Sequence, residues 1–342
     1  MKKRVFKIAI LFLAIFLFFF VFSFRKLPSE IKYGVSFSKF HSDELKLDWK
    51  ETYLALLNDL GVKKIRLTAH WPNTEPLNDK FNFSELDFQI AEAEKRGLEV
   101  ILAVGRRLPG WPECHVPDWA RVKSEKLKVK SIADYDQEEL LKYIETVVNR
   151  YKELQSIKYW QVENEPFLTF FSRANCGELD KNFLEKEVAL VKRLDPTRSV
   201  LMTDSGEFGT WFGAYKRGDI FGTSLYLYIW NKKFNLPFRY PILPAFFRFK
   251  QNLVSLIYGK KPSLIIELSA EPWLLQPIVD TPIEVLQERM GLDKFNEMID
   301  FAAKTGFDEQ YLWGAEWWYW MKKQGYPEHW ERAKELLQGS PL

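Results

Sequence analysis

Eight short apolar runs, separated by amphipathic segments of helical character, recur along this chain of 342 residues and constrain its fold more than any other feature. Runs such as Ser263–Ile266 are apolar almost without interruption, which is typical of parallel strands buried on both faces. Eight strand–helix units in about 300 residues predict an α/β fold, a closed (β/α)8 TIM barrel rather than an open doubly wound sheet. The expected strands are 33–37, 64–69, 100–105, 158–162, 200–203, 220–226, 264–268 and 311–315.

Local signals predict where several helices begin and end. Residues 48–51 form a capping box, and the helix that follows should end at Gly61. A second helix is expected within residues 84–97, from a serine to a glycine. Residues 281–284 combine a threonine cap, a proline and a glutamate, and they should open one helix that runs toward Gly306.

No repeat, low-complexity tract or Pro/Gly-rich linker divides the chain after residue 26, so we expect one domain over residues 27–342. Long loops are expected after the third and sixth strands. The segment Asn231–Phe249, rich in Phe, Pro and Arg, should form an excursion with its own small hydrophobic cluster, at the barrel mouth or beside a membrane. Because no glycine-rich phosphate loop follows the first strand, a dinucleotide-binding fold loses its main support.

Residues 8–24 form an almost unbroken apolar run with positive charges on both sides. Its length is close to the minimum for a spanning helix, and only Ser23 is a small residue suited to signal-peptide cleavage. We therefore predict an uncleaved N-terminal transmembrane anchor (signal-anchor) at residues 1–26, with cleavage and secretion as the alternative. The stronger positive cluster before the run predicts a cytoplasmic N-terminus and an extracytoplasmic folded domain.

Composition limits the classes of function. Aromatic residues make up 16% of the chain, including 13 Trp, which is high for a globular protein. Six basic residues lie within residues 1–26, so the rest of the chain carries 43 basic against 46 acidic residues, and no nucleic-acid footprint is expected. The four His lack zinc-site spacing. Neither a metal nor another cofactor is predicted.

Two of the expected strands end in glutamate-bearing motifs, at the barrel face where reactive groups gather. The fourth strand ends in WQVENEP (160–166) and the seventh in IIELSAEPW (265–273). An Asn-Glu-Pro alone recurs by chance and usually marks a turn, but here it falls on the fourth strand while a second glutamate closes the seventh. In this the chain resembles the clan-A retaining glycoside hydrolases, barrels that include cellulases, β-galactosidases, β-mannanases and β-xylosidases.

The resemblance implies that Glu165 is the acid/base and Glu267 the nucleophile. Such a pair needs carboxyl groups about 5–5.5 Å apart, one protonated and one ionised. Each has a rival nearby. Glu163 precedes the Asn and would more naturally orient a neighbour, and Glu271 lies beyond the apolar run that Glu267 directly closes.

The resemblance also assigns residues that support this pair. Asn164 would hold the sugar 2-hydroxyl. Tyr226, at the end of the sixth strand, would hydrogen-bond the nucleophile, and Arg66 in the second strand would keep Glu267 ionised. Plainer interpretations remain, namely a half-buried strand tyrosine and a buried arginine paired with some other acid.

The eighth strand runs into WGAEWWYW (313–320), where the family places a tryptophan beneath the sugar at the cleavage point. We choose Trp317, with Trp318 second, because aromatic faces pack against sugar C–H groups. An aromatic stripe is more often core, so part of this run is expected to be packed. Other residues of the predicted top loops are expected to bind substrate or line a longer groove: His70, Trp71, Trp111, Trp119, Glu271 and Trp273.

The two cysteines are expected to link two loops at this face of the barrel. Cys114 lies in the loop 106–119, which matches no general motif of the clan and should set substrate choice, and Cys176 lies in the next top loop. In an exported domain they can pair. We predict a Cys114–Cys176 disulfide worth about 4 kcal/mol less any strain. Two buried free thiols are the alternative.

The sequence thus predicts a monomeric glycosidase that acts on a β-linked oligo- or polysaccharide through a covalent glycosyl-enzyme and contacts the membrane through its N-terminal helix. A transglycosylase that remodels surface glycan would keep the same residues. A catalytically silent carbohydrate-binding barrel would not need both glutamates. The third strand lacks the His of some cellulase families, and Ser224 stands where several have His or Asn, so the sugar stays open.

Overall fold

Eight parallel strands close into a barrel in the computed structural model, which describes residues 19, 23–123, 130–231 and 236–339. Neighbours follow the order β1-β12-β11-β8-β7-β6-β3-β2, so every strand is paired on both sides. The barrel strands are β1 (Lys32–Ser36), β2 (Lys64–Thr68), β3 (Glu99–Val104), β6 (Ile157–Val162), β7 (Ser199–Asp204), β8 (Ile220–Leu225), β11 (Ser263–Ser269) and β12 (Glu309–Trp313). All eight expected strands are therefore present, with ends shifted by one or two residues.

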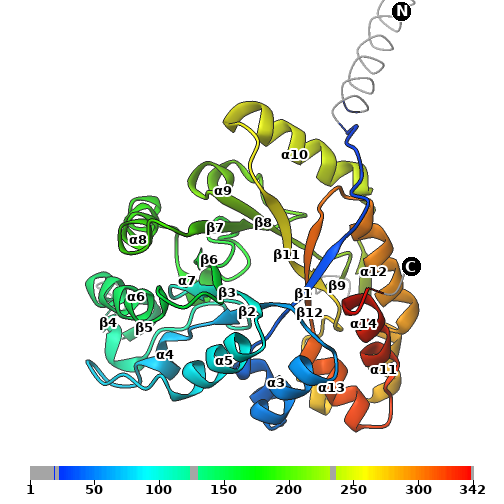
Figure 1. The fold of residues 1–342 in the computed structure, drawn as a ribbon, viewed down its shortest axis with the longest axis horizontal. Coiled ribbons are helices and arrows are strands. Elements are labelled where there is room, and N and C mark those ends of the chain that lie inside the picture. Colours follow the sequence, from blue (N-terminus) through cyan, green and yellow to red (C-terminus); the bar gives the residue numbers. More distant parts are fainter. Residues whose placement is uncertain (1–18, 20–22, 124–129, 232–235, 340–342) are drawn as a thin grey trace, which may run out of the picture.

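Helices surround the barrel (Figure 1). They are α2 (Lys39–Glu44), α3 (Trp49–Asn58), α4 (Trp71–Thr74), α5 (Ser84–Lys95), α6 (Gln137–Tyr151), α7 (Arg173–Cys176), α8 (Lys181–Leu194), α9 (Phe212–Arg217), α10 (Pro244–Tyr258), α11 (Ile283–Arg289), α12 (Leu292–Ala303), α13 (Ala315–Lys323) and α14 (Glu328–Leu337). Two antiparallel pairs decorate the loops: β4 (Arg121–Lys123) with β5 (Lys130–Tyr135), and β9 (Tyr228–Asn231) with β10 (Leu236–Arg239).

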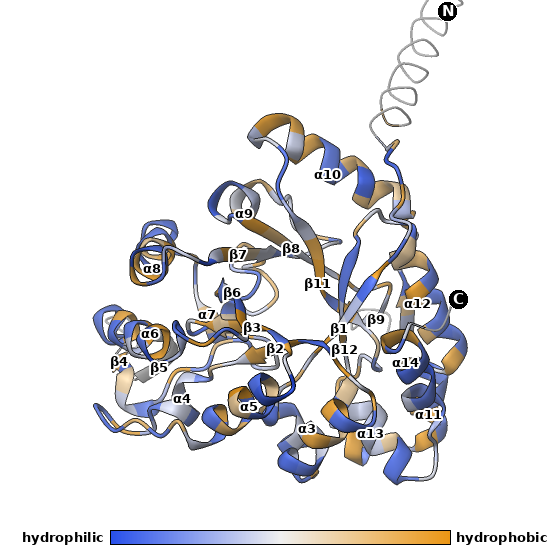
Figure 2. Cartoon of the chain, in the orientation of Figure 1, coloured by the Kyte–Doolittle hydropathy of each residue, from blue (hydrophilic) through white to orange (hydrophobic). Residues whose placement is uncertain are grey.

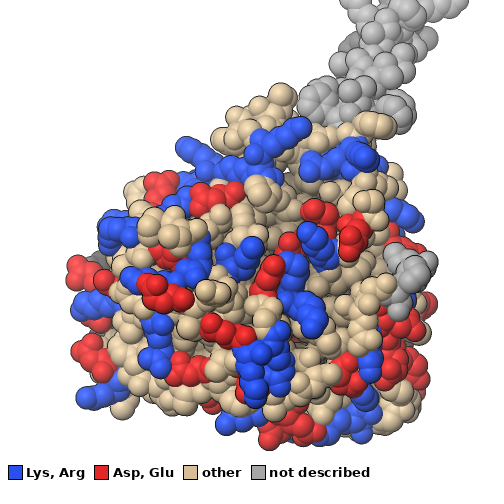
Figure 3. Space-filling view, in the orientation of Figure 1, with Lys and Arg blue, Asp and Glu red and all other residues tan. Residues whose placement is uncertain are grey.

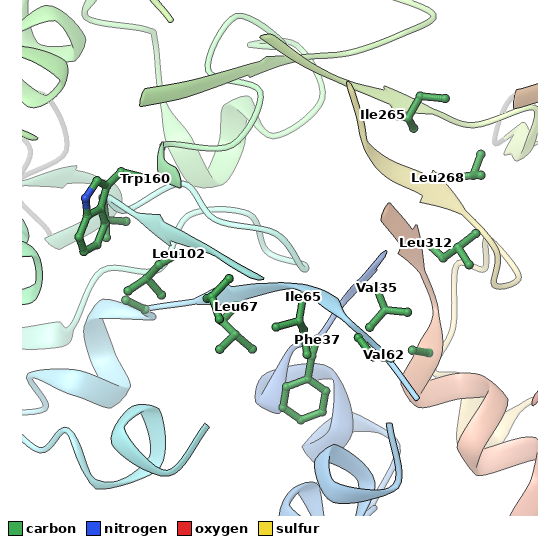
Figure 4. Close-up of a cluster of buried hydrophobic side chains, with 14 of the residues drawn as sticks. Val35, Phe37, Val62, Ile65, Leu67, Leu102, Trp160, Ile265, Leu268 and Leu312 are labelled. Carbon is green, nitrogen blue, oxygen red and sulfur yellow. The ribbon is translucent and has the colours of Figure 1, made fainter. Parts of the chain in front are cut away.

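The barrel strands separate two hydrophobic clusters. The larger, part of which Figure 4 shows, packs the strands against the helices and includes Leu102. The smaller contains Ile101, Leu201, Ile266 and Tyr311, from the alternate positions of their strands, and fills the barrel interior. Hydrophobic and hydrophilic residues mix along each helix (Figure 2), as expected for helices with one buried face.

The predicted helix starts are confirmed for two helices and wrong for a third. Asp48 caps α3 by accepting hydrogen bonds from two backbone amides, and α5 begins at Ser84. The helix expected from residues 281–284 to Gly306 is instead two helices, because the chain is extended at Gly291, which caps α12. Pro282, not Thr281, occupies the cap position of α11.

The segment Asn231–Phe249 is less irregular than expected. Its described part contributes to the β9–β10 pair and then, from Pro244, to helix α10. A proline at the first turn suits a helix start because its missing N–H would have no partner there. The second half of the segment is thus the barrel helix that follows β8.

The N-terminal anchor predicted at residues 1–26 lies almost entirely outside the described residues. Within the part of the chain that the structure describes, no helix is both long and apolar enough to cross a membrane. On the face seen in Figure 3, acidic and basic side chains are interspersed, so that face carries no extended field of one sign.

Candidate active site

The two candidate glutamates occupy one end of the barrel. Glu165 follows β6 in the loop before α7, and Glu267 lies within β11. Both are nearly buried, at 8% and 9% exposure. Their carboxyl groups are close enough that the charge of Glu267 raises the pKa of Glu165. The fold therefore brings together two carboxylates separated by a hundred positions in the chain.

A bulge in β11 aims Glu267 into the barrel. Ile265 pairs with Thr223 of β8, but the next paired residue is Glu267, so Ile266 is extra. Strict alternation would place Ile266 and Glu267 on opposite faces of the sheet. Instead Ile266 belongs to the inner cluster, Leu268 to the outer one, and Glu267 bonds an interior arginine. Bulges re-aim side chains in this way at many active sites.

Two donors hold the Glu267 carboxylate. Arg66 Nη1 lies 2.9 Å from Oε2, and Tyr226 Oη donates to Oε1 at 2.5 Å. Burial and the charge of Glu267 raise the pKa of the Tyr226 phenol well above its ordinary value, so the phenol keeps its proton and donates. The contacts of Arg66 and Tyr226 are those expected from the sequence.

Arg66 is the centre of a buried polar network. Its side chain is fully buried, and its remaining donors reach Gln161 Oε1 at 2.9 Å and Asn164 Oδ1 at 2.7 Å. A guanidinium without compensating charge would be very costly in this interior. Because Gln161 also donates to Asn164 Oδ1, the Asn164 amide nitrogen faces the other way and stays available as a donor.

Glu165 is arranged to hold a proton. Burial first, and then the charge of Glu267, raise the pKa of Glu165 well above its ordinary value. Its Oε1 is buried and has no hydrogen-bond partner within the described residues. Its backbone N–H donates to Thr203 Oγ1 at 2.8 Å, which fixes the loop. A carboxyl group that holds its proton and keeps one oxygen without a partner is suited to donate to a leaving oxygen.

The loop that carries Glu165 is strained. Glu163 and Glu165 have φ of 56° and 45°, in the left-handed region that disfavours residues with a side chain. Glu163 accepts hydrogen bonds from the backbone N–H groups of Arg106 and Arg107. This rival of Glu165 therefore orients a neighbouring loop, as expected. Gly105 is required beneath it, since a Cβ there would lie 2.5 Å from the Glu163 carboxylate.

Glu271, the rival of Glu267 and a predicted substrate contact, bonds to protein groups instead. Its oxygens meet His41 Nε2 and Trp313 Nε1, both at 2.7 Å. Burial opposes protonation of His41, but the charge of Glu271 outweighs it and raises the pKa of His41 well above its usual value. Glu271 thus holds a histidine and a tryptophan in place at the end of β12.

The prediction that three tryptophans bind substrate is wrong. Trp317, Trp318 and Trp71 have no exposed surface. Helix α13 begins directly after β12, which turns Trp318 into the core, where its Nε1 donates to Ala270 O at 2.7 Å. Trp71 opens α4 and stacks on Tyr143. A ring without exposed surface cannot be a platform for sugar.

His70, which the sequence predicted to bind substrate, is also nearly buried. Its ring meets His115 edge-on, 4.5 Å between centroids, and packs against Phe40. Burial, then the neighbouring His115, lower the pKa of His70 well below its usual value. His70 Nε2 has no hydrogen-bond partner in the described part of the chain, which leaves a neutral imidazole nitrogen free.

A row of aromatic side chains in mutual contact begins beside Glu267, and the sequence did not predict that these rings contact one another. Tyr226 contacts Trp273, Trp273 contacts Phe171, and Phe171 contacts Trp111, with centroids 5.3, 5.6 and 6.2 Å apart. The row joins loops from four strands, and Trp111 is 58% exposed. It offers the apolar surface that the buried tryptophans cannot provide. Trp119 lies away from it, against Trp71.

Glu113 was also missed. Burial raises the pKa of this carboxyl group, in the loop after β3, to about 7, and the charge of Glu267 contributes. The sequence signal was weak, because the loop matches no motif. Among the described residues, no group of three or more His, Cys, Asp or Glu is arranged to hold a metal ion.

Cys114 and Cys176 form a disulfide across a sequence separation of 62 residues, the pairing expected from the sequence. It joins the loop after β3 to α7, beyond the acid/base loop. Replacing both cysteines by serine should lower the free energy of unfolding by about 2–4 kcal/mol, because the unfolded chain gains loop freedom. Urea denaturation would measure this. Dithiothreitol should reproduce the loss in the wild type and leave the double variant unchanged; a reduced wild type of unaltered stability would contradict the prediction.

Comparison with known proteins agrees with this geometry. Residues 42–197, just under half of the chain, match the family Glyco_hydro_42, described as β-galactosidase. β-Galactosidase BgaA of Clostridium cellulovorans is 24% identical over 166 residues, which cover 46% of this chain and 25% of that protein. A putative mannan endo-1,4-β-mannosidase 4 of Arabidopsis thaliana is 29% identical over 154 residues, covering 38% and 34%. The chain spans a quarter to a third of the length of these curated relatives.

Solved structures share the barrel. GH5_18 from Bifidobacterium longum subsp. longum, as a variant in complex with Manb1-4GlcNAc, superposes with a TM-score of 0.56 at 12% identity, covering 83% of this chain and 69% of that one. At this identity the likeness concerns the fold alone. The family match, the barrel and the two glutamate-bearing strand ends together make the chain similar to the clan-A glycoside hydrolases and support a glycosidase of that kind.

Proposed function

We propose that the chain hydrolyses β-linked glycosides with retention of configuration, with Glu165 as acid/base and Glu267 as nucleophile. One observation carries this proposal. A buried carboxyl group with a raised pKa lies beside a second carboxylate that an arginine and a tyrosine hold. Pairs of carboxyl groups whose surroundings separate their protonation states are the mark of acid and nucleophile in one site.

The residues divide the two steps between them. In the first, Glu267 attacks the anomeric carbon while the proton of Glu165 passes to the leaving oxygen, which breaks the glycosidic bond. In the second, Glu165 takes a proton from water, and the resulting hydroxide attacks the anomeric carbon and releases Glu267. Arg66 and Tyr226 orient the Glu267 carboxylate throughout, and the available Asn164 amide would donate to the sugar 2-hydroxyl.

The relatives suggest β-galactosides and β-mannosides as first substrates. The test is a panel of 4-nitrophenyl β-glycosides and β-mannan or β-galactan oligosaccharides, with the anomer of the first product followed by proton NMR. We expect turnover of at least one member and a β-configured first product. An α-configured first product would overturn retention. Exclusive transfer of the glycosyl group to a sugar acceptor instead of water would identify a transglycosylase. Binding of sugar without turnover would identify a catalytically silent carbohydrate-binding barrel.

We also propose that residues 8–24 anchor the domain to a membrane, with the domain on the extracytoplasmic side. The end of the apolar run lies on α10, where Arg248 Nε donates to Ser23 O at 2.8 Å and Phe19 stacks on Phe249 at 5.2 Å. Near the C-terminal end of α10, Leu256 and Ile257 are exposed apolar side chains on the same helix.

Carbonate extraction of cells that express the full chain tests this anchor. The full chain should stay with the membrane pellet, and residues 27–342 alone should be released. A mature N-terminus near residue 26, found by sequencing, would overturn the anchor in favour of secretion.

A further inference from the structure

Glu113 is a third carboxyl group of the site, and neither the acid/base nor the nucleophile role requires it. Asn164 lies close enough to lower the pKa of the Glu113 carboxyl group, against the larger effect of burial. Its other polar neighbour, Arg107 Nε, is 3.9 Å away, beyond hydrogen-bond distance. The side chain keeps 15% of its surface exposed. A carboxylate that served only to fix the loop would be saturated by backbone donors, as Glu163 is.

The backbone holds Glu113 firmly. Leu108 N donates to Glu113 O, and Glu113 N donates to Gly110 O, both at 2.8 Å, which closes a tight turn. Glu113 has φ of 73°, an unfavourable conformation for a glutamate, and the next residue is the disulfide-bonded Cys114. Such a conformation persists only where the surroundings impose it.

The loop that carries Glu113 is also bound to the loop that carries the acid/base. Asn164 N donates to Arg107 O at 2.6 Å, and Arg107 Nη2 donates to Leu168 O at 3.0 Å. Behind this contact, burial and the adjacent charge of Glu163 raise the pKa of Glu187 in α8 well above its ordinary value. Glu113 and Glu165 therefore belong to one rigid unit.

The position of Glu113 indicates which part of a sugar it meets. With the anomeric carbon between Glu165 and Glu267, the Asn164 amide is at the 2-hydroxyl. Glu113 lies next to Asn164, and the following ring position carries the 3-hydroxyl. Above its raised pKa of about 7, the Glu113 carboxylate has free lone pairs and accepts strongly from a sugar hydroxyl. Galactose and mannose differ at C2 and C4 but share an equatorial 3-hydroxyl, so this contact suits both.

We propose that Glu113 binds the 3-hydroxyl of the sugar at the cleavage point and thereby positions the substrate, favouring sugars that carry an equatorial hydroxyl there. This rests on the proposed function, because it needs a sugar between Glu165 and Glu267. Glu113 positions the substrate and takes no part in bond breaking.

The test compares an aryl β-glycoside from the panel with its 3-deoxy analogue, in wild type, Glu113→Ala and Glu113→Gln. A hydrogen bond to a charged group corresponds to about 10- to 100-fold in kcat/KM. We expect wild type to prefer the 3-hydroxyl substrate by that factor, Glu113→Ala to lose the preference, and Glu113→Gln to keep part of it. The 3-deoxy substrate should react at a similar rate in all three proteins.

Glu178→Ala, in the exposed loop on the other side of the disulfide, is the matched control and should keep the full preference. If kcat/KM falls by the same factor for both substrates in Glu113→Ala, the residue only shapes the site and the proposal is wrong. Loss of discrimination against the 2-deoxy analogue instead would overturn the placement at C3. Calorimetry can compare the binding of galactose and mannose with that of their 3-deoxy forms without any turnover. If the wild type were inactive, the hydrolase proposal would be refuted, but these affinities would still test the role of Glu113.

Discussion

Glu267→Gln should reduce kcat on an aryl β-glycoside by about 10⁵-fold, the scale seen when a nucleophile that acts together with its partners is removed. The change is nearly isosteric, and the amide oxygen can still accept from Tyr226. The loss in kcat should therefore come from chemistry, while the free energy of unfolding should also fall, because the buried Arg66 loses its charged partner. Stopped assays over days and urea denaturation of both proteins would measure the two effects. Turnover equal to that of the wild type would remove Glu267 from the mechanism.

Glu165→Gln provides the internal comparison. This residue donates a proton to the leaving group. The leaving group of a 2,4-dinitrophenyl glycoside needs no proton, so kcat/KM should fall far less for this substrate than for a methyl glycoside. Wild-type kcat/KM should fall as pH rises through the raised pKa of Glu165, because only the protonated form can donate. That alkaline decline should vanish in the variant. Equal loss on both substrates would contradict the acid role.

Arg66→Met should have the second large effect. It leaves the Glu267 carboxylate buried without its charged partner, and it removes the donors to Gln161 and Asn164. Breaking one side of a buried pair typically costs about 3–5 kcal/mol. We expect the free energy of unfolding to fall by about that amount and kcat to fall as well, because Glu267 loses its orientation. Urea denaturation at neutral pH would show the loss.

The double variant Arg66→Met/Glu267→Gln separates charge from packing. Removing the unpaired carboxylate should recover part of the lost stability, so the two effects should be less than additive. Strict additivity would mean that the contact between these side chains contributes nothing. Arg173→Met, whose side chain on α7 is 69% exposed, is the control for a surface arginine and should change stability by at most about 0.5 kcal/mol.

The parts of the fold that were predicted correctly are those with local causes. A parallel strand buried on both faces must be apolar along its length, so runs such as Ser263–Ile266 mark strands before any contact is known. Asp48 caps a helix through amides two and three residues away. Where the local signal was ambiguous the prediction was wrong, as at Gly291, which interrupts an otherwise helical stretch.

The tryptophans show most plainly what could not be predicted from the sequence. Trp317 and Trp318 follow a barrel strand at the face where sugars would bind, and their side chains suit a sugar as well as a core. Helix α13 begins at Ala315, and its direction buries both rings. Which face of a helix is buried depends on what packs against it, and that packing is a property of the whole barrel.

The sequence by itself determined the barrel, through the period of its apolar runs, and the identity of the paired glutamates, because strand ends in such a barrel converge on one face. The tertiary structure alone decided that Ile266 bulges so that Glu267 turns inward, that the loop after β3 brings Glu113 against Asn164, and which aromatic rings remain exposed. The physical reason is range. Strand and helix signals arise between residues a few positions apart, whereas burial, pKa and side-chain direction are set by neighbours that only the closed barrel brings together.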